Sequence, residues 1–153
     1  MDISRHSPIE VSAADFRTMG HQLVDQLADF LAAMGTQPVT KGEGPETLKK
    51  FLGTAPLPEN GTAPQDLLNR AAKLLLEHSL FNGHPRFMGY ITGAAAPVGA
   101  LADLLAATVN PNVGAQVLSP MATEIEKQTV KWLAELVGLT PGYGGILVSG
   151  DRK

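Results

Sequence analysis

Side chains that could do chemistry are few in this chain, and most stand alone. Glu124 and Glu126 lie two positions apart beside an expected helix start, where they could act as a general acid–base pair. That spacing places them on different faces of a helix, and carboxylates near a helix N-terminus are stabilised by its dipole. Dipole stabilisation is therefore preferred over catalysis.

His84 and the pair Ser149-Gly150 are further candidates. His84 precedes a proline in a segment rich in Gly and Pro, so it could contact a substrate or serve as a hydrogen-bonded structural residue. Ser149-Gly150 follows the apolar run 144–148, which predicts a short strand leading into a turn. By itself, a Ser-Gly pair after a strand is usually just a turn. Cysteine is absent, which excludes disulfides and thiolate metal sites.

Helices are the elements that must position these residues. Ser12 is expected to cap the first one with Asp15 as its partner, and Gly35 to end it. Apolar residues recur along this helix at steps of three and four, at Phe16, Met19, Leu23, Leu27, Phe30, Leu31 and Met34. The stretch 36–62 is rich in Gly and Pro, which predicts a surface connection with one short helix over 47–52.

Three more long helices follow. The second begins at Pro64 and ends near Ser79, with a predicted buried side at Leu67, Leu68, Ala71, Leu74, Leu75 and His78. The third, 94–109, has Asp103 as its only charge, which predicts burial on several sides, either in the core of this chain or against another surface. The fourth has Ser119 as its cap and Gly138 as its stop. Its inward residues are predicted to be Ile125, Thr129, Trp132, Leu133, Leu136 and Val137.

Composition is ordinary for a globular protein, and the lack of cysteine favours a cytoplasmic location. The 153 residues are 44% hydrophobic and 18% charged, with a formal net charge of -3, which argues against general affinity for nucleic acid or anionic membranes. The run 104–123 is uncharged, but Asn110-Pro111-Asn112 interrupts it, so a membrane span is rejected. The first ten residues lack the apolar core of a secretory signal.

Several motifs occur in an order that is familiar. Phe16, Gly20, Val24 and Asp25 match a Phe-x-x-x-Gly-x-x-x-Val-Asp helix. Further motifs stand at 84–90 (HPRFMGY), 100–105 (ALADLL), 110–114 (NPNVG), 119–126 (SPMATEIE) and 145–150 (Gly-Gly-x-x-x-Ser-Gly). Together they resemble the N-terminal portion of the group II pyridoxal-phosphate-dependent amino-acid decarboxylases, which act on aromatic amino acids, tyrosine, histidine and glutamate.

The resemblance implies a fold, a cofactor and a partner. We expect a mainly α chain of four long helices plus one short strand, forming the N-terminal part of an α/β fold of the aspartate-aminotransferase type (fold type I). Residues 1–80 would be a helical dimerisation segment, and 81–153 the start of the large domain that binds pyridoxal 5'-phosphate. The implied assembly is a homodimer or higher homo-oligomer, and the implied substrate is an amino acid.

The resemblance also assigns site residues. Tyr90 matches an aromatic residue at the mouth of the substrate pocket, and Ile91 and Thr92 follow it in a loop that crosses the dimer interface. Gly114 corresponds to another residue lining the pocket, commonly larger in relatives. Ser149 and Gly150 match the turn that binds the cofactor phosphate.

The end of the chain departs from the family pattern. Asp151 stands where relatives have further Gly, Ser or Thr, and its carboxylate would repel a phosphate. The family's Schiff-base lysine follows a histidine, and no His-Lys pair occurs here. We therefore expect an N-terminal decarboxylase fragment that is inactive alone and assign it no catalytic residue. The alternative is a non-catalytic helical module that associates with itself or with a partner.

Overall fold

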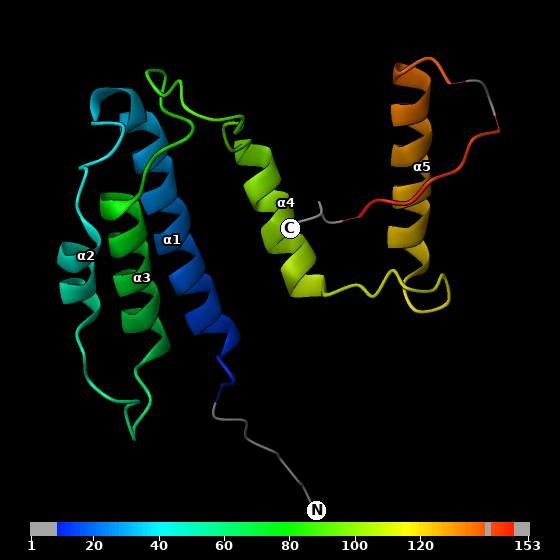
Figure 1. Ribbon diagram of the computed structural model, residues 1–153. Coiled ribbons are helices and arrows are strands. Elements are labelled where there is room, and N and C mark those ends of the chain that lie inside the picture. Colours follow the sequence, from blue (N-terminus) through cyan, green and yellow to red (C-terminus); the bar gives the residue numbers. More distant parts are fainter. Residues whose placement is uncertain (1–8, 140–141, 149–153) are drawn as a thin grey trace, which may run out of the picture. The chain divides into compact units, whose positions relative to one another are not determined.

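The computed structural model describes residues 9–139 and 142–148. The chain divides into two compact units, residues 1–95 and 96–153, and each is described by itself (Figure 1). The described part contains five α-helices, one short 3-10 helix and no strand, so the helical class is as predicted and the strand is not. The predicted boundary at residues 80 and 81 divides the chain by function and stays a prediction, whereas the packing divides it after Ala95.

Helix α1 (Ala13–Ala33) begins where the sequence predicts. The Oγ of Ser12 accepts a hydrogen bond from the backbone N–H of Asp15 at 3.0 Å, and its hydroxyl donates to the Asp15 carboxylate at 2.6 Å. The cap is confirmed, because one of the N–H groups left open at the helix start is satisfied. The helix ends two residues early, and a 3-10 turn, η1 (Met34–Thr36), contains the expected stop at Gly35.

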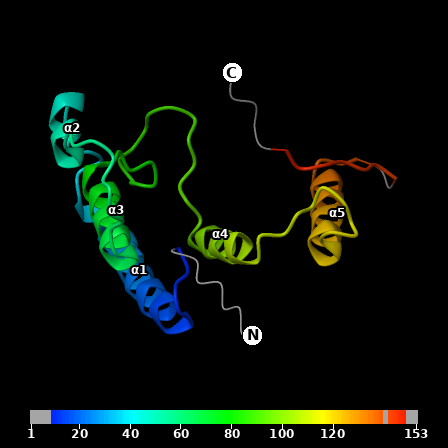
Figure 2. The same ribbon diagram turned by 90° about the horizontal axis from the view of Figure 1, so that it is seen from below.

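Helices α1 and α3 (Pro64–His78) pack side by side, as both views show (Figures 1 and 2). Ala72 is buried, and Leu68 and Leu76, four residues to either side, are partly buried. The predicted buried side of α3 is confirmed in part, since Leu74 and His78 are partly buried like Leu68, whereas Leu67 and Leu75 are 59% and 65% exposed. Periodicity identified an apolar helix, but only the packing against α1 selects which of its two apolar rows is covered.

The connection between α1 and α3 carries α2 (Pro45–Leu52), which begins two residues before the predicted start. Two contacts hold this short helix to α3. The Arg70 guanidinium donates to the backbone oxygen of Phe51 at 3.0 Å, and the Phe51 ring lies 4.2 Å from the His78 ring, centroid to centroid. An isolated helix of eight residues is marginal in water, so its stability depends on these contacts.

Helix α4 (Pro97–Val109) begins at a proline, three residues later than predicted, and ends at Asn110 in a left-handed conformation. Its apolar residues are not buried within its unit, since Val98, Leu101 and Leu105 are 76%, 57% and 65% exposed. The chain's own core therefore does not bury α4, and burial of this helix against a partner stays a prediction. None of the helices described is long and apolar enough to span a bilayer.

Helix α5 (Pro120–Leu136) ends as predicted. Gly138 has a φ of +79° and donates its N–H to Glu135, while the N–H of Leu139 bonds to the carbonyl of Ala134 at 2.9 Å. These are the two hydrogen bonds of a Schellman motif. At the start, the Ser119 side chain makes no capping bond, contrary to prediction.

The covered side of α5 also differs from the prediction. Residues 142–148 run along the helix, where the Glu126 carboxylate accepts the backbone N–H of Leu147 at 3.0 Å (Figure 1). The predicted inward side is exposed instead, with Trp132 at 62% and Leu136 at 82%. The segment 142–148 is not a strand, because a strand needs a neighbour to pair its backbone and the described residues supply none.

Candidate functional site

The candidate site begins with a segment of turns, residues 81–87, that follows α3. The turns are closed by hydrogen bonds from His84 N–H to the Phe81 carbonyl at 3.0 Å and from Phe87 N–H to the His84 carbonyl at 2.9 Å. The N–H of Phe81 bonds to the carbonyl of Val39 at 2.9 Å. This segment is therefore fastened to the chain that leaves α1.

His84 is 2% exposed, and both of its ring nitrogens are occupied. Nε2 lies 2.9 Å from the backbone oxygen of Gln37, and Nδ1 lies 3.0 Å from the backbone nitrogen of Arg86. An N–H can only donate and a carbonyl can only accept, so Nδ1 is the acceptor and Nε2 carries the proton. These contacts support the structural interpretation of His84, because no ring nitrogen is left for a substrate.

The loop after this segment, which precedes the second unit at residue 96, holds the predicted substrate residues, and their side chains are exposed. Tyr90 is 90% exposed, Ile91 is fully exposed, and Thr92 is also exposed. Tyr90 has a φ of +57°, which is uncommon for a residue with a side chain. Left-handed backbone at a non-glycine residue is strained and tends to occur where a ligand is bound.

Gly114 belongs to the second unit and lies in a turn after α4. Its N–H donates to the Oδ1 of Asn112 at 3.0 Å, which closes the turn. A Cβ at this position would stand 3.0 Å from the same oxygen. A larger residue here would therefore displace the Asn112 side chain, which explains locally why glycine is suited to this turn.

The remaining candidates are not assembled into a site by the described structure. Ser149 and Gly150 lie outside the described residues. Glu124 is held by Lys127 at 2.7 Å and Gln116 at 2.8 Å, while Glu126 bonds to the backbone of Leu147. The two carboxylates therefore have separate partners, and an acid–base pair is not supported.

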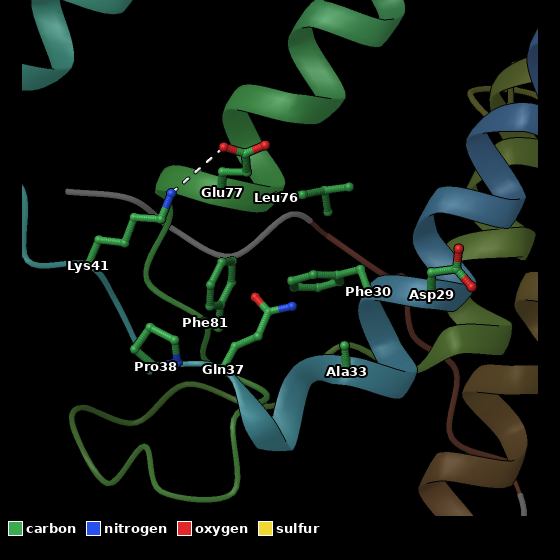
Figure 3. Close-up of a pocket in the computed structure, with 9 residues that line it drawn as sticks. All are labelled: Asp29, Phe30, Ala33, Gln37, Pro38, Lys41, Leu76, Glu77 and Phe81. Atoms are coloured by element: carbon green, nitrogen blue, oxygen red, sulfur yellow. Dashed lines mark ion pairs between the residues drawn. The ribbon is translucent and has the colours of Figure 1, made fainter.

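Sequence reasoning missed a hollow of about 310 Å³ in the first unit (Figure 3). The rings of Phe30 and Phe81 meet edge to face in it, with centroids 5.0 Å apart, and a Lys41–Glu77 ion pair of 3.7 Å stands at its side. The other residues around it are Asp29, Ala33, Gln37, Pro38 and Leu76. It contains none of the predicted substrate residues. One indication of it was present in the sequence, since part of its lining comes from the stretch 36–62, which was predicted to be a surface connection.

A second cluster that the sequence did not predict centres on His78. Its Nδ1 lies 2.6 Å from the Glu43 carboxylate, 35 residues earlier in the chain, and the two side chains are 12% and 20% exposed. Glu77 lies 3.8 Å from the other ring nitrogen. Because each of these polar groups has a protein partner, the cluster fastens the connection to α3 and offers no open site.

The family model for the pyridoxal-dependent decarboxylase conserved domain matches residues 45–151. This stretch includes the 84–90 segment, the exposed loop and the turn of Gly114. The chain belongs to the pyridoxal-dependent decarboxylase family. The predicted family resemblance is thereby confirmed.

Two relatives show how much of a decarboxylase the chain spans. It is 30% identical over 142 residues to an aromatic-L-amino-acid decarboxylase of Bacillus atrophaeus, covering 93% of this chain and 29% of the relative. It is 33% identical over 130 residues to a tyrosine decarboxylase of Oryza sativa subsp. japonica, covering 84% of this chain and 24% of the relative. The chain thus spans less than a third of the length of these relatives.

Solved decarboxylase structures share the fold. The Oryza sativa TDC crystal structure with PLP has a TM-score of 0.75 at 23% identity, covering 89% of this chain and 28% of that one. The glutamate decarboxylase domain of a Vibrio parahaemolyticus protein has a TM-score of 0.73 at 17% identity, covering 89% and 29%. These likenesses are consistent with the predicted fold type I.

Pyridoxal phosphate is the cofactor of this decarboxylase family, and the described residues do not fit a covalent site for it. A lysine that binds the cofactor aldehyde needs an enclosed position in which its amine is desolvated. All six described lysines are exposed, and four of them pair with glutamates. No cluster of metal-binding side chains occurs among the described residues either.

Proposed function

We propose that this chain supplies the substrate-entrance part of a pyridoxal-phosphate-dependent amino-acid decarboxylase and is inactive by itself. Tyr90, Ile91 and Thr92 would contact the amino-acid substrate, and Gly114 would line the substrate pocket of the assembled enzyme. Ser149 and Gly150 would form the first edge of the phosphate site. The working assembly is a homodimer or higher homo-oligomer, placed in the cytoplasm.

The exposed loop of Tyr90 carries this proposal. Apolar and aromatic side chains at a loop tip cost free energy in water, as does left-handed backbone at a non-glycine residue. Met88, Tyr90 and Ile91 are nevertheless at least 90% exposed, on a loop whose base is buried at His84. A strained, apolar tip on a fixed base is suited to insertion into a surface outside its own unit.

The chemistry divides between this chain and residues outside it. When bound, the cofactor supplies an electron sink for the carbon that loses carbon dioxide. The residues described here would orient the substrate and exclude water from the entrance. The amine that binds the cofactor must come from elsewhere in the assembled enzyme, because every described lysine is exposed.

A chimera tests this function. In it, the 153 residues replace the aligned portion of the Bacillus atrophaeus decarboxylase, and the product is checked for folding, oligomeric state and bound cofactor. We expect decarboxylase activity that falls at least about tenfold with Tyr90→Ala, which corresponds to about 1.4 kcal/mol of lost interaction. Tyr143→Ala is the control at the other tyrosine and should be neutral. A folded, loaded chimera insensitive to Tyr90→Ala contradicts the proposal.

Inactivity of the chain alone has its own test. The isolated chain is titrated with pyridoxal 5'-phosphate, and the cofactor absorbance is recorded. We expect only the weak change that exposed lysines of any protein produce. A strong, saturable band that disappears when one lysine is substituted by alanine would overturn this part of the proposal.

The alternative is a non-catalytic module that associates through its helices. The exposed apolar residues of α4 favour it, because a helix with a single charge is poorly soluble unless a partner covers it. Co-expression with the chimera distinguishes the two functions. A module would join the oligomer and leave its activity per chimera subunit unchanged.

A further inference from the structure

His84 occupies an unusual place between two parts of the first unit. One ring nitrogen bonds within its own turn, to the N–H of Arg86, two residues away. The other bonds to the carbonyl of Gln37, 47 residues earlier and just beyond the end of α1. A single buried ring therefore joins the base of the exposed loop to the helix pair.

The contacts at Gln37 are not equal. The Arg86 guanidinium also donates to the Gln37 carbonyl, at 3.2 Å, but Arg86 is exposed. The His84 bond is shorter, at 2.9 Å, and is shielded from water because the ring is 2% exposed. A hydrogen bond in a shielded site opens less often than one in contact with solvent, so the His84 bond is the stronger of the two contacts at Gln37.

We propose that His84 is a positioning residue that holds the Tyr90 loop in its strained conformation through the Gln37 carbonyl. The hydrogen bonds within 81–87 keep the turns in shape but do not set their direction. Contacts outside the segment set that direction. The Phe81 N–H bonds to the Val39 carbonyl at the start of the segment, and the His84–Gln37 bond is the buried contact nearer to the Tyr90 loop. The loop's role in substrate binding rests on the proposed function. The contact between His84 and Gln37 can be tested without an activity assay.

Two substitutions separate the halves of this contact. Asparagine at position 84 keeps an acceptor near the place of Nδ1 and can still bond to the N–H of Arg86, as in an Asx turn. It is too short to reach Gln37. Glutamine places an amide N–H near the place of Nε2 and can keep the bond to Gln37. His84→Asn therefore removes the long-range bond and His84→Gln retains it.

Limited chymotrypsin digestion of the chain, followed by mass spectrometry, measures how readily the loop is cleaved after Tyr90. The chain has two tyrosines, and cleavage after Tyr143, in the other unit, is the internal reference for cleavage after Tyr90. We expect the Tyr90 to Tyr143 ratio to rise roughly five-fold or more in His84→Ala and His84→Asn. It should stay within about twofold of wild type in His84→Gln and in the exposed control His21→Ala.

The opposite ranking of the variants overturns the proposal. If His84→Asn behaves as wild type and His84→Gln releases the loop, the local turn holds the loop and Gln37 does not.

Wild-type protein gives a test that needs no variant to fold. Nitrogen chemical shifts of the His84 ring should show the proton on Nε2, and a proton on Nδ1 instead contradicts the contact. If the cleavage ratios change as expected but the chimera has no decarboxylase activity, the result contradicts the proposed function and leaves the role of His84 standing.

Discussion

At the scale of single residues, His78 makes two kinds of contact that hold distant segments together. It bonds to the Glu43 carboxylate at 2.6 Å, and its ring lies against Phe51. Both side chains of the hydrogen-bonded pair are at least four-fifths covered, so water competes weakly for the bond. Removing one partner leaves the other covered and unpaired, which is costly.

His78→Ala should therefore destabilise the first unit by about 1.5–3 kcal/mol, the range for hydrogen bonds to charged groups. Urea unfolding followed by circular dichroism measures this loss. His21→Ala, at an exposed position on α1, is the matched control and should change stability by less than about 0.5 kcal/mol. Equal midpoints for the two variants would show that the His78 contacts add nothing.

Two glycines make opposite predictions for the same substitution. Gly138 has a φ of +79° at the end of α5, so Gly138→Ala should cost about 1 kcal/mol. Gly20 lies in the middle of α1, and an added methyl there would meet no neighbouring side chain within 4 Å, so Gly20→Ala should stabilise by about 0.5–1 kcal/mol. Thermal unfolding midpoints that move in the same direction would contradict the assigned backbone conformations.

At the scale of elements, the short helix α2 depends on its neighbour. Its last turn is held by the bond from Arg70 to the Phe51 carbonyl and by the Phe51–His78 ring contact. Its own Lys49–Glu46 pair is exposed and adds little. Helix α2 is therefore the element of the first unit expected to open first.

Hydrogen exchange of residues 45–52 tests this dependence. Arg70→Ala should speed exchange there roughly two- to five-fold, as expected for losing one partly solvated hydrogen bond of about 0.5–1 kcal/mol. Lys73 is an exposed cation on α3, the helix that also carries Arg70, and Lys73→Ala should leave the exchange rate of residues 45–52 unchanged. Faster exchange throughout α1 and α3 as well would mean that Arg70 supports the whole unit, contrary to expectation.

At the scale of the whole molecule, the chain leaves much apolar surface uncovered. Among the described residues Ala72 is the only buried apolar side chain, while large apolar residues of α4 and α5 are mostly more than half exposed. Such a surface has a favourable free energy of association, because covering it removes apolar area from water. Self-association is the expected behaviour of the isolated chain.

Sedimentation velocity over a range of concentrations measures that association. Leu101→Asp, on α4, should shift the chain toward monomer, because an aspartate would be buried without a partner in the interface. Leu57→Asp is the control at a connection residue that is 92% exposed and should leave association unchanged. Wild-type protein that stays monomeric at every concentration contradicts the dimer proposal and the module alternative together.

Prediction from sequence succeeded where the physical cause is local. The cap at Ser12, the proline starts of α3 and α5 and the stop at Gly138 are each decided by hydrogen bonds or backbone angles within a few residues. The family motifs were readable for a similar reason, since each is a short run of residues. The irregular backbone of the segment that ends at Tyr90 followed from its Gly and Pro content.

Only the tertiary structure could decide which residues meet across the chain. Nothing in the sequence pairs His84 with a carbonyl 47 residues away, or His78 with Glu43. The covered row of α3 and the exposed side of α5 likewise depend on which neighbour is present. Amino-acid order thus determined the helices and most of their ends, because those are satisfied within one or two turns, although the cap expected at Ser119 does not form. The contacts that fasten the Tyr90 loop required the folded chain, because they join segments that are adjacent only in space.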